Sequence, residues 1–119
     1  MPYTLKDSGK RQAFSTGAVR DIQDGKGFFH LISPFMETRL AKWLEKGAKK
    51  YDARNWELGM PFSRCVDSAK RHIAKFCMGM EDEDHLAAAI FNIMAIIHFQ
   101  ETGRKELDDM PHYIKEEKQ

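Results

Sequence analysis

The chain contains stretches in which apolar residues recur every three or four positions, the spacing typical of one helix face. The first begins at Ser33-Pro34, where serine suits a helix cap and proline suits the first turn, and it predicts a helix over 34–50. Its apolar positions are Phe35, Met36, Leu40, Trp43, Leu44 and Ala48. The second stretch begins at Pro61 and ends near Gly79, a residue type that favours helix C-termini. Its apolar positions are Phe62, Cys65, Val66, Ala69, Ile73 and Phe76.

A third stretch, residues 86–97, is apolar on all sides, and Asn92 is its one polar side chain. A helix of this kind is normally covered on every side by other parts of the protein. Three helices of one short chain can hardly cover it, so we expect a homo-oligomer, a dimer or larger. The stretch is also too short to cross a bilayer, so we expect no membrane association.

The remaining residues show no long helical period. Residues 1–33 contain several glycines and predict an irregular arm, with a short strand or hairpin near Phe28–Ile32. Residues 104–119 are polar and acidic and predict a peripheral tail with a short helix at most. The pattern as a whole predicts an all-α helical bundle. It forms a single domain over 1–119, with the arm at 1–33, the helical core at 34–103 and the tail at 104–119.

Length and composition agree with this picture. The chain has 119 residues and a mass of 13.8 kDa, which is one domain, and its 42% hydrophobic and 31% charged residues exclude disorder over the whole chain. Cys65 and Cys77 are twelve residues apart on one predicted helix. Their Cα atoms would be about 18 Å apart, too far for a disulfide. Two free thiols favour a reducing compartment, so we expect a cytoplasmic protein.

Charge changes sign along the chain. Residues 39–80 carry a balance of +6 and residues 81–119 a balance of −6, while the whole chain carries +1. Two alternatives follow: two solvated faces that attract each other, or one pocket in which cations hold a polyphosphate and carboxylates hold a divalent metal. The balancing acidic segment argues against a nucleic-acid-binding protein, which normally concentrates positive charge on one face.

The start of the third helix holds the first candidate chemistry. Glu81 and Asp84 have the spacing Glu-x-x-Asp, which lets two carboxylates share a hard metal such as Mg²⁺, although an acidic helix N-terminus explains the same residues. His85 and Asn92 are seven residues apart and therefore face the same side of the helix. Each is equally well explained as a structural residue, bonded to a neighbouring helix or at the surface.

The other two helices carry polar stripes beside their apolar stripes. On the second helix the stripe comprises Arg64, Asp67 or Ser68, and Arg71, with His72 on an adjacent line. On the first helix Glu45 and Lys49 form an i,i+4 pair. Either these are solvated faces, or the three helices share one site between them.

Several segments together resemble a known family. They are Phe14-Ser15-Thr16-Gly17-Ala18-Val19-Arg20-Asp21, Gly25-Lys26-Gly27, Glu45-Lys46-Gly47-Ala48-Lys49-Lys50-Tyr51, Arg54-Asn55-Trp56, Ser63-Arg64, Asp67-Ser68-Ala69, Arg71-His72, and Glu83-Asp84-His85-Leu86-Ala87-Ala88-Ala89 with Asn92 behind it. This run, over residues of about 12–100, resembles the phage-type dATP/dGTP diphosphohydrolase N-terminal domain family. That family is regarded as similar to the all-α MazG-like nucleotide pyrophosphohydrolases, which are helical dimers or tetramers.

The resemblance implies a function and a set of site residues. It implies Mg²⁺- or Mn²⁺-dependent cleavage of purine deoxynucleoside triphosphates, dATP or dGTP, to monophosphate and pyrophosphate, in the host cytoplasm if the chain is phage-encoded. The implied catalytic residues are Glu45, Asp67 and Asp84. The implied metal ligands are Glu45, Glu81, Asp84 and His85. The implied substrate-binding residues are Lys49, Tyr51, Asn55, Trp56, Arg64, Arg71, His72 and Asn92, with Tyr51, Trp56 or Phe91 stacking on the base.

One departure from the MazG-like pattern leaves an alternative open. Those enzymes carry Glu-x-x-Glu on one helix and Glu-x-x-Asp on the next, whereas Glu37 and Glu45 of this chain are eight residues apart. The alternative is a non-catalytic nucleotide-binding or host-interaction phage protein that retains the fold.

Overall fold

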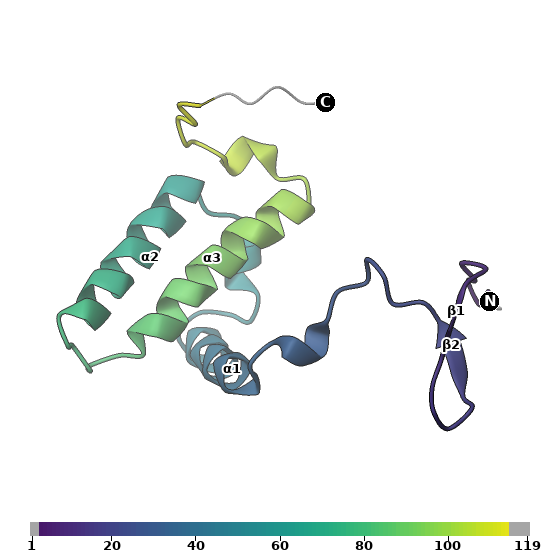
Figure 1. The fold of residues 1–119 in the computed structure, drawn as a ribbon. Coiled ribbons are helices and arrows are strands. Elements are labelled where there is room, and N and C mark those ends of the chain that lie inside the picture. The colour runs from purple at the N-terminus through teal and green to yellow at the C-terminus, as the bar shows by residue number, and fades with distance from the viewer. Residues whose placement is uncertain (1–2, 115–119) are drawn as a thin grey trace. The chain divides into compact units, whose positions relative to one another are not determined.

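The computed structural model describes residues 3–114 and shows a mostly helical chain, which confirms the predicted all-α class. The chain divides into two compact units between Ile32 and Ser33, and each is described by itself. The second unit contains α1 (Pro34–Lys50), α2 (Phe62–Cys77) and α3 (His85–Glu101), with 3₁₀ turns at Asn55–Leu58 and Lys105–Leu107 (Figure 1). Residues 115–119 of the predicted tail lie outside the described residues, as do residues 1–2 of the arm.

The N-terminal unit contains a small antiparallel hairpin of β1 (Arg11–Ala13) and β2 (Val19–Asp21). Gly17 allows the turn between them because it adopts a φ of 92°, a left-handed conformation that suits glycine. The prediction of a short strand or hairpin near Phe28–Ile32 is wrong. That segment instead forms a 3₁₀ turn at Phe29–Leu31, closed by backbone bonds that the amide groups of Leu31 and Ile32 donate.

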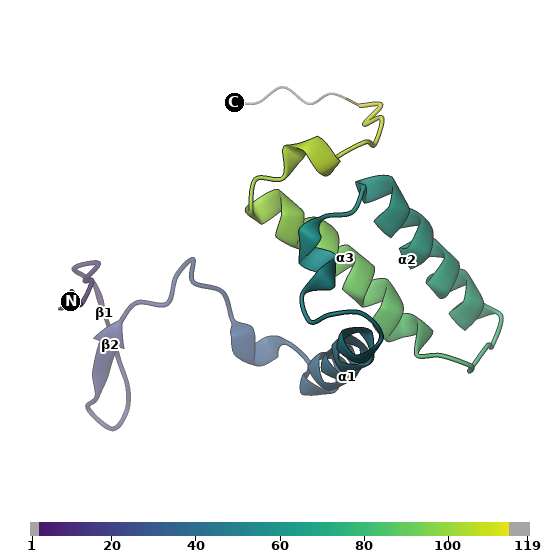
Figure 2. The same ribbon diagram turned by 180° about the vertical axis from the view of Figure 1, so that it is seen from behind.

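Helix α1 has the predicted bounds, and its capping residue explains why it begins there. The Ser33 hydroxyl accepts a hydrogen bond from the backbone N–H of Met36, and Pro34 occupies the first turn. Lys49 and Lys50 lie in the last turn, where positive charge complements the helix dipole. The helix packs against α3 (Figure 2).

The core lies between α2 and α3, which run side by side (Figures 1 and 2). Phe62 and Cys65 of α2 meet Ala95 and Phe99 of α3 in a buried cluster. Partly buried side chains pack around this cluster: Trp56, Met60, Ile96, Leu107 and Met110. Leu107 and Met110 come from the predicted tail, so that segment contributes to the core.

Asp109 of the tail is bonded to the start of α2. The Asp109 carboxylate accepts hydrogen bonds from the backbone N–H and the hydroxyl of Ser63, at 2.8 and 2.5 Å. These bonds satisfy an amide in the first turn of α2, which has no side-chain cap of its own.

The structure bears on two further expectations, one about the cysteines and one about membrane-spanning helices. Cys65 and Cys77 are both free thiols on α2, the first buried and the second exposed, as the helix spacing predicts. Within residues 3–114, no helix combines the length and the apolar character needed to cross a bilayer.

From the packing of this core, we expect Phe99→Ala to destabilise the protein strongly. Phe99 is fully buried, so the variant loses its transfer free energy and leaves a cavity, and we expect the free energy of unfolding to fall by about 3–5 kcal/mol. Urea unfolding followed by far-UV circular dichroism measures this. The matched control is Phe35→Ala, because Phe35 is 81% exposed, and its change should stay within about 0.5 kcal/mol. Equal losses in both variants would contradict this description of the core.

Candidate functional site

Two buried histidines meet where α2 leads into α3. His72 lies on α2 and His85 is the first residue of α3, and they are 8% and 3% exposed. Their Nδ1 atoms are 2.9 Å apart, and the Nε2 atom of His85 lies 2.8 Å from a carboxylate oxygen of Asp82. The side chains therefore form a chain of polar contacts from solvent-exposed Asp82 into the space between the helices.

This geometry determines which nitrogen carries each proton. The Asp82 carboxylate accepts the hydrogen bond, and this bond from His85 lowers the pKa of Asp82. His85 therefore carries its proton on Nε2, and when neutral it has a lone pair on Nδ1. His72 must then donate through its own Nδ1–H. Burial lowers the pKa of His72, which favours the neutral ring.

A third side chain with an atom that could bind a metal lies beside the two histidines. His72, Glu83 and His85 each offer one ligand atom, and these atoms lie within 4.8 Å of one another. Within residues 3–114, this is the one group of three or more histidine, cysteine or acidic side chains that meets this distance. Trp43 of α1 presents the His72 ring with an edge-on aromatic contact, with centroids 6.0 Å apart, and so closes one side of the group.

Asp84 has a clear structural role next to this group. Its carboxylate accepts a hydrogen bond from the backbone N–H of Ala87 and so caps α3. It also accepts two hydrogen bonds from the guanidinium of Arg39 on α1, at 2.8 and 2.5 Å. The Arg39 bond is the main cause of the lowered pKa of Asp84, which stays ionised. Asp84 therefore attaches the start of α3 to α1.

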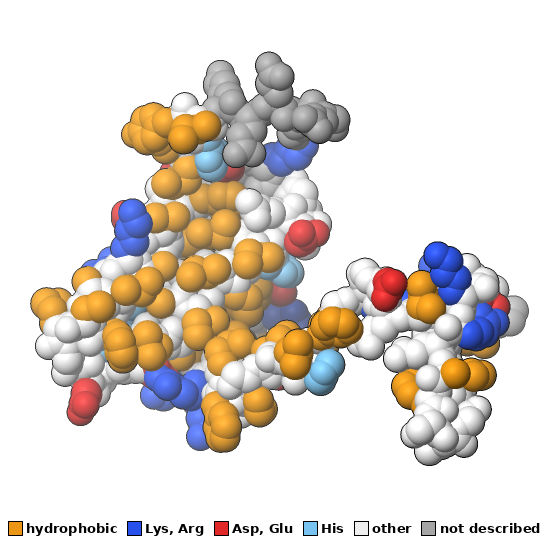
Figure 3. Space-filling view, viewed as in Figure 1, with side chains coloured by type: hydrophobic (Ala, Val, Ile, Leu, Met, Phe, Trp, Pro, Cys, Tyr) orange, Lys and Arg blue, Asp and Glu red, His pale blue; other side chains and the backbone are white. Residues whose placement is uncertain are grey.

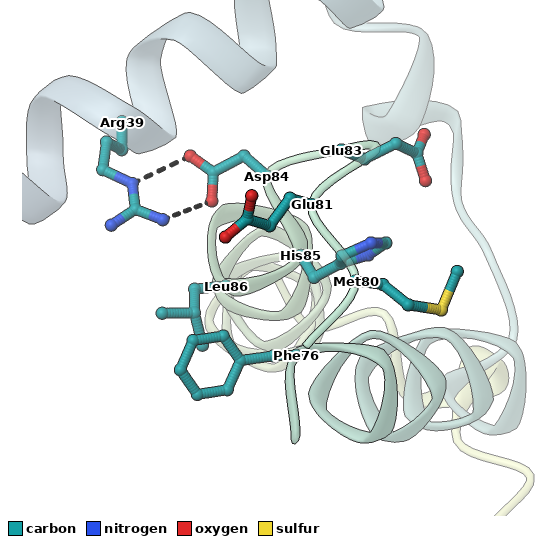
Figure 4. Close-up of a pocket in the computed structure, with 8 residues that line it drawn as sticks. All are labelled: Arg39, Phe76, Met80, Glu81, Glu83, Asp84, His85 and Leu86. Atoms are coloured by element: carbon teal, nitrogen blue, oxygen red, sulfur yellow. Dashed lines mark hydrogen bonds and ion pairs between the residues drawn. The ribbon is translucent and has the colours of Figure 1, made fainter. Parts of the chain in front are cut away.

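These groups surround a shallow pocket of about 210 Å³ (Figure 4). Its polar lining comprises Arg39, Glu81, Glu83, Asp84 and His85, and its apolar lining comprises Phe76, Met80 and Leu86. In Figure 4 the Arg39–Asp84 pair lies on one side and the side chains of Glu83 and His85 lie on the other. Three of the four predicted metal ligands, Glu81, Asp84 and His85, therefore share one pocket.

Asn92 is buried further along the same face of α3, and its amide nitrogen donates two hydrogen bonds. Its amide nitrogen donates to the carbonyl of Ala88 at 2.8 Å and to the hydroxyl of Ser68 at 3.1 Å. The second bond joins α3 to α2, so the structure gives Asn92 a helix-pairing role.

The remaining charged candidates lie away from the pocket lining. Glu45 forms an exposed i,i+4 pair with Lys49 on α1, with 3.7 Å between the charged atoms. The side chains of Arg64, Asp67 and Arg71 are exposed on α2. None of these five lines the pocket, and their catalytic and binding roles stay predictions.

The aromatic candidates differ in their surroundings. Trp56 packs against Phe91, His98 and Phe99, so its ring belongs to the edge of the core. Tyr51 is exposed at the end of α1, beneath the ammonium of Lys50. Asn55 begins the 3₁₀ turn that carries Trp56.

Sequence reasoning did not single out Arg39, Asp82, Glu83 or Trp43 as site residues. Asp82 and Glu83 were visible as members of the acidic run 81–84, and their proximity to two histidines was the missing information. Arg39 lies 45 residues before its partner Asp84, so only the packing of α1 on α3 brings them together.

The lowered pKa of Asp84 predicts a pH-dependent contribution to stability. Since the pair depresses the folded-state pKa, its contribution is complete above the unfolded pKa of about 3.9 and disappears as the pH falls through the folded value. Asp84→Asn retains a capping side chain but loses the charge, and should destabilise by about 1 kcal/mol at pH 7. Urea unfolding at pH 7 and pH 2.5 measures the difference from the parent protein. A deficit that persists undiminished at pH 2.5 would contradict the ion-pair explanation, and Glu101→Gln serves as a control on the far end of α3.

Comparison with known proteins adds one finding to this geometry. The family described as dATP/dGTP diphosphohydrolase, N-terminal, matches residues 16–110. No curated protein and no solved structure matches significantly. The family match covers all three helices and every residue that lines the pocket, and the chain therefore belongs to the dATP/dGTP diphosphohydrolase N-terminal family.

Proposed function

We propose that the chain hydrolyses purine deoxynucleoside triphosphates, dATP or dGTP, to the monophosphate and pyrophosphate with the help of Mg²⁺ or Mn²⁺. The observation that carries the proposal is the pocket at the start of α3, where carboxylates and an imidazole lie opposite a guanidinium, in a chain of a diphosphohydrolase family. The free thiols of Cys65 and Cys77 fit a reducing compartment, so we place this activity in the cytoplasm, that of the host if the chain is phage-encoded.

The donor set of the pocket fits a divalent metal. Glu81 and Glu83 supply carboxylate oxygens, which Mg²⁺ and Mn²⁺ prefer, and His85 adds a nitrogen that Mn²⁺ accepts. Asp84 fits less well as a ligand, because its oxygens are bonded to Arg39 and to the amide of Ala87. An ion held by Glu81, Glu83 and His85 would supply positive charge to the phosphates and a more acidic bound water.

The cations near the pocket are suited to bind the phosphate chain. Arg39 lines the pocket, and the positive charge of Lys46 is near enough to contribute to the lowered pKa of Asp84. A guanidinium matches a phosphate with two parallel hydrogen bonds, and neutralising the phosphates favours departure of pyrophosphate. Arg39 would exchange one of its bonds to Asp84 for a phosphate oxygen. Lys49, Arg64 and Arg71 extend the same positive segment, and Tyr51 offers an exposed ring to the base.

We further propose that a second copy of the chain covers one face of α2 and α3. On α3 the positions Leu86, Ile90, Ile93 and Ile97 form a stripe at four- and three-residue spacing, and Ile93 and Ile97 are 48% and 52% exposed. Ile73 and Phe76 of α2 are also about half exposed. Figure 3 shows apolar side chains gathered over both helices, and an exposed apolar patch of this kind is typical of an interaction surface.

A second candidate function is a non-catalytic nucleotide-binding or host-interaction protein. It is favoured by the position of Glu45 and Asp67, two of the three predicted catalytic carboxylates, outside the pocket lining. This alternative retains phosphate binding at Arg39 but requires no turnover.

Product analysis distinguishes the two functions. Purified protein should convert dATP and dGTP, and much less dCTP and dTTP, to monophosphate and pyrophosphate in the presence of Mg²⁺ or Mn²⁺. Glu83→Gln removes a pocket carboxylate with little change of shape and should lower kcat at least tenfold, because one donor for the metal is lost. Anion-exchange chromatography of the nucleotides, with a separate pyrophosphate assay, gives both products.

The control for this experiment is Glu106→Gln, because Glu106 is exposed in the 3₁₀ turn at Lys105–Leu107 and pairs only locally with Arg104. No turnover of any nucleotide under either metal would contradict the enzyme proposal. Calorimetry with the same nucleotides would then show whether the binding function remains.

The oligomer prediction has its own test. Ile93→Glu places a charge in the middle of the exposed stripe, so it should shift the mass measured by light scattering from dimer to monomer. Leu58→Glu is the matched control, because Leu58 is 78% exposed in the 3₁₀ turn at Asn55–Leu58, away from the stripe. A monomeric parent protein at micromolar concentration would contradict the proposal, as would a mass unchanged by Ile93→Glu.

A further inference from the structure

We propose that His72, Glu83 and His85 form a binding site for one first-row divalent transition metal, and that this site selects such a metal over Mg²⁺. The three ligand atoms come from α2, from the segment between the helices and from the first turn of α3, and they already lie within 4.8 Å of one another. The site shares Glu83 and His85 with the pocket described above, and His72 adds a ligand from outside the pocket lining. The inference does not depend on the proposed function, because the binding itself requires no nucleotide.

The distance between the two histidines suits a shared metal ion. Imidazole nitrogens lie about 2.1 Å from a divalent transition metal, so two of them at right angles are about 3.0 Å apart and at the tetrahedral angle about 3.4 Å apart. The Nδ1 atoms of His72 and His85 are 2.9 Å apart. The metal would therefore occupy the place of the proton that the two rings share, with small movements of the side chains.

The second nitrogen of His85 is held as it is in many metal sites. A metal-bound histidine usually donates its other N–H to a carboxylate, which fixes the ring and its tautomer. The Nε2–H of His85 donates to Asp82 at 2.8 Å, which leaves Nδ1 with its lone pair toward His72. On metal binding His72 exchanges its Nδ1 proton for one on Nε2, so two neutral rings bind the ion without a net release of protons.

The chemistry of the donors determines the class of metal. Two imidazoles and one carboxylate suit ions from Mn²⁺ to Zn²⁺, whereas Mg²⁺ prefers oxygen ligands and keeps several of its waters. Burial of both rings and the aromatic contact between Trp43 and His72 limit water on that side. Glu83 is exposed and lines the pocket with His85, so the ion would remain open to a phosphate oxygen or a water.

Direct metal binding tests the inference without nucleotide. The protein is stripped with a chelator and titrated in a calorimeter with Zn²⁺ or Co²⁺ alone, and the bound metal is counted by elemental analysis after dialysis. We expect about one ion per chain and retention of that ion in a large excess of Mg²⁺. Binding should also raise the Tm, because the ion binds the folded state in preference to the unfolded chain.

Substitutions test whether the proposed ligands, and not other side chains of the protein, bind the metal. His72→Gln and His85→Gln should each weaken Zn²⁺ binding by at least a hundredfold. Asp82→Asn should weaken it about tenfold or more, because it removes the group that orients His85. His98→Gln is the control, since His98 lies on α3 near Glu57 and outside the group. Circular dichroism of each metal-free variant establishes that it is folded, and the Tm rise on adding Zn²⁺ should vanish in the two histidine variants alone.

The possible outcomes are distinct from those of the hydrolysis experiment. Zn²⁺ affinity unchanged in folded His72→Gln or His85→Gln would overturn the inference, as would displacement of the ion by Mg²⁺ at comparable concentration. Loss of binding in both histidine variants, with His98→Gln unaffected, supports it even where no nucleotide is hydrolysed. Turnover in Mg²⁺ without any histidine-dependent metal binding would overturn the inference and leave the proposed function in place.

Discussion

The close packing of α2 against α3 is the constraint on which the rest of the helical unit depends. The contact face of α3 carries His85, Ala88, Asn92, Ala95 and Phe99, at alternating spacings of three and four residues, and all five are buried. The facing stripe of α2 carries Phe62, Cys65, Ala69 and His72 at the same spacings, also buried. Alanines in the middle of both stripes allow the backbones to approach, and their small side chains leave room for polar groups to meet between the helices.

This seam changes from apolar to polar along its length. At one end Phe62 and Cys65 meet Phe99, where burial of apolar surface is the main source of stability. In the middle Asn92 bonds Ser68, and at the other end His72 meets His85. Buried polar groups cost free energy unless they are bonded, so each must find its partner on the facing helix. The polar end therefore depends on the register that the apolar end establishes, and the pocket lies beside His85 at that end.

The sequence predicted local features well because local features have local causes. The bounds of α1 follow from the Ser33 cap and the proline beside it, and the free cysteines follow from their spacing on one helix. The hairpin at β1 and β2 was missed, because its turn through Gly17 is not one of the short two-residue turns that are easily recognised. The pairing of His72 with His85 and of Arg39 with Asp84 could not be predicted, since each depends on the register between two helices. The acidic run was correctly noted, but its four carboxylates have different surroundings: Asp82 orients a histidine, Asp84 caps a helix, and Glu81 and Glu83 face the pocket.

The outer face of α3 connects the proposed oligomer with the candidate site. A helix whose inner stripe is buried and whose outer stripe is also apolar leaves one apolar stripe in water when the chain is alone. Leu86 begins the outer stripe of α3 and also lines the pocket, as does Phe76 of α2. A second copy that covers the stripe would reach the rim of the pocket and remove water from one side of it. Electrostatic interactions with phosphate strengthen as water is excluded, so dimerisation would complete the site as well as the fold.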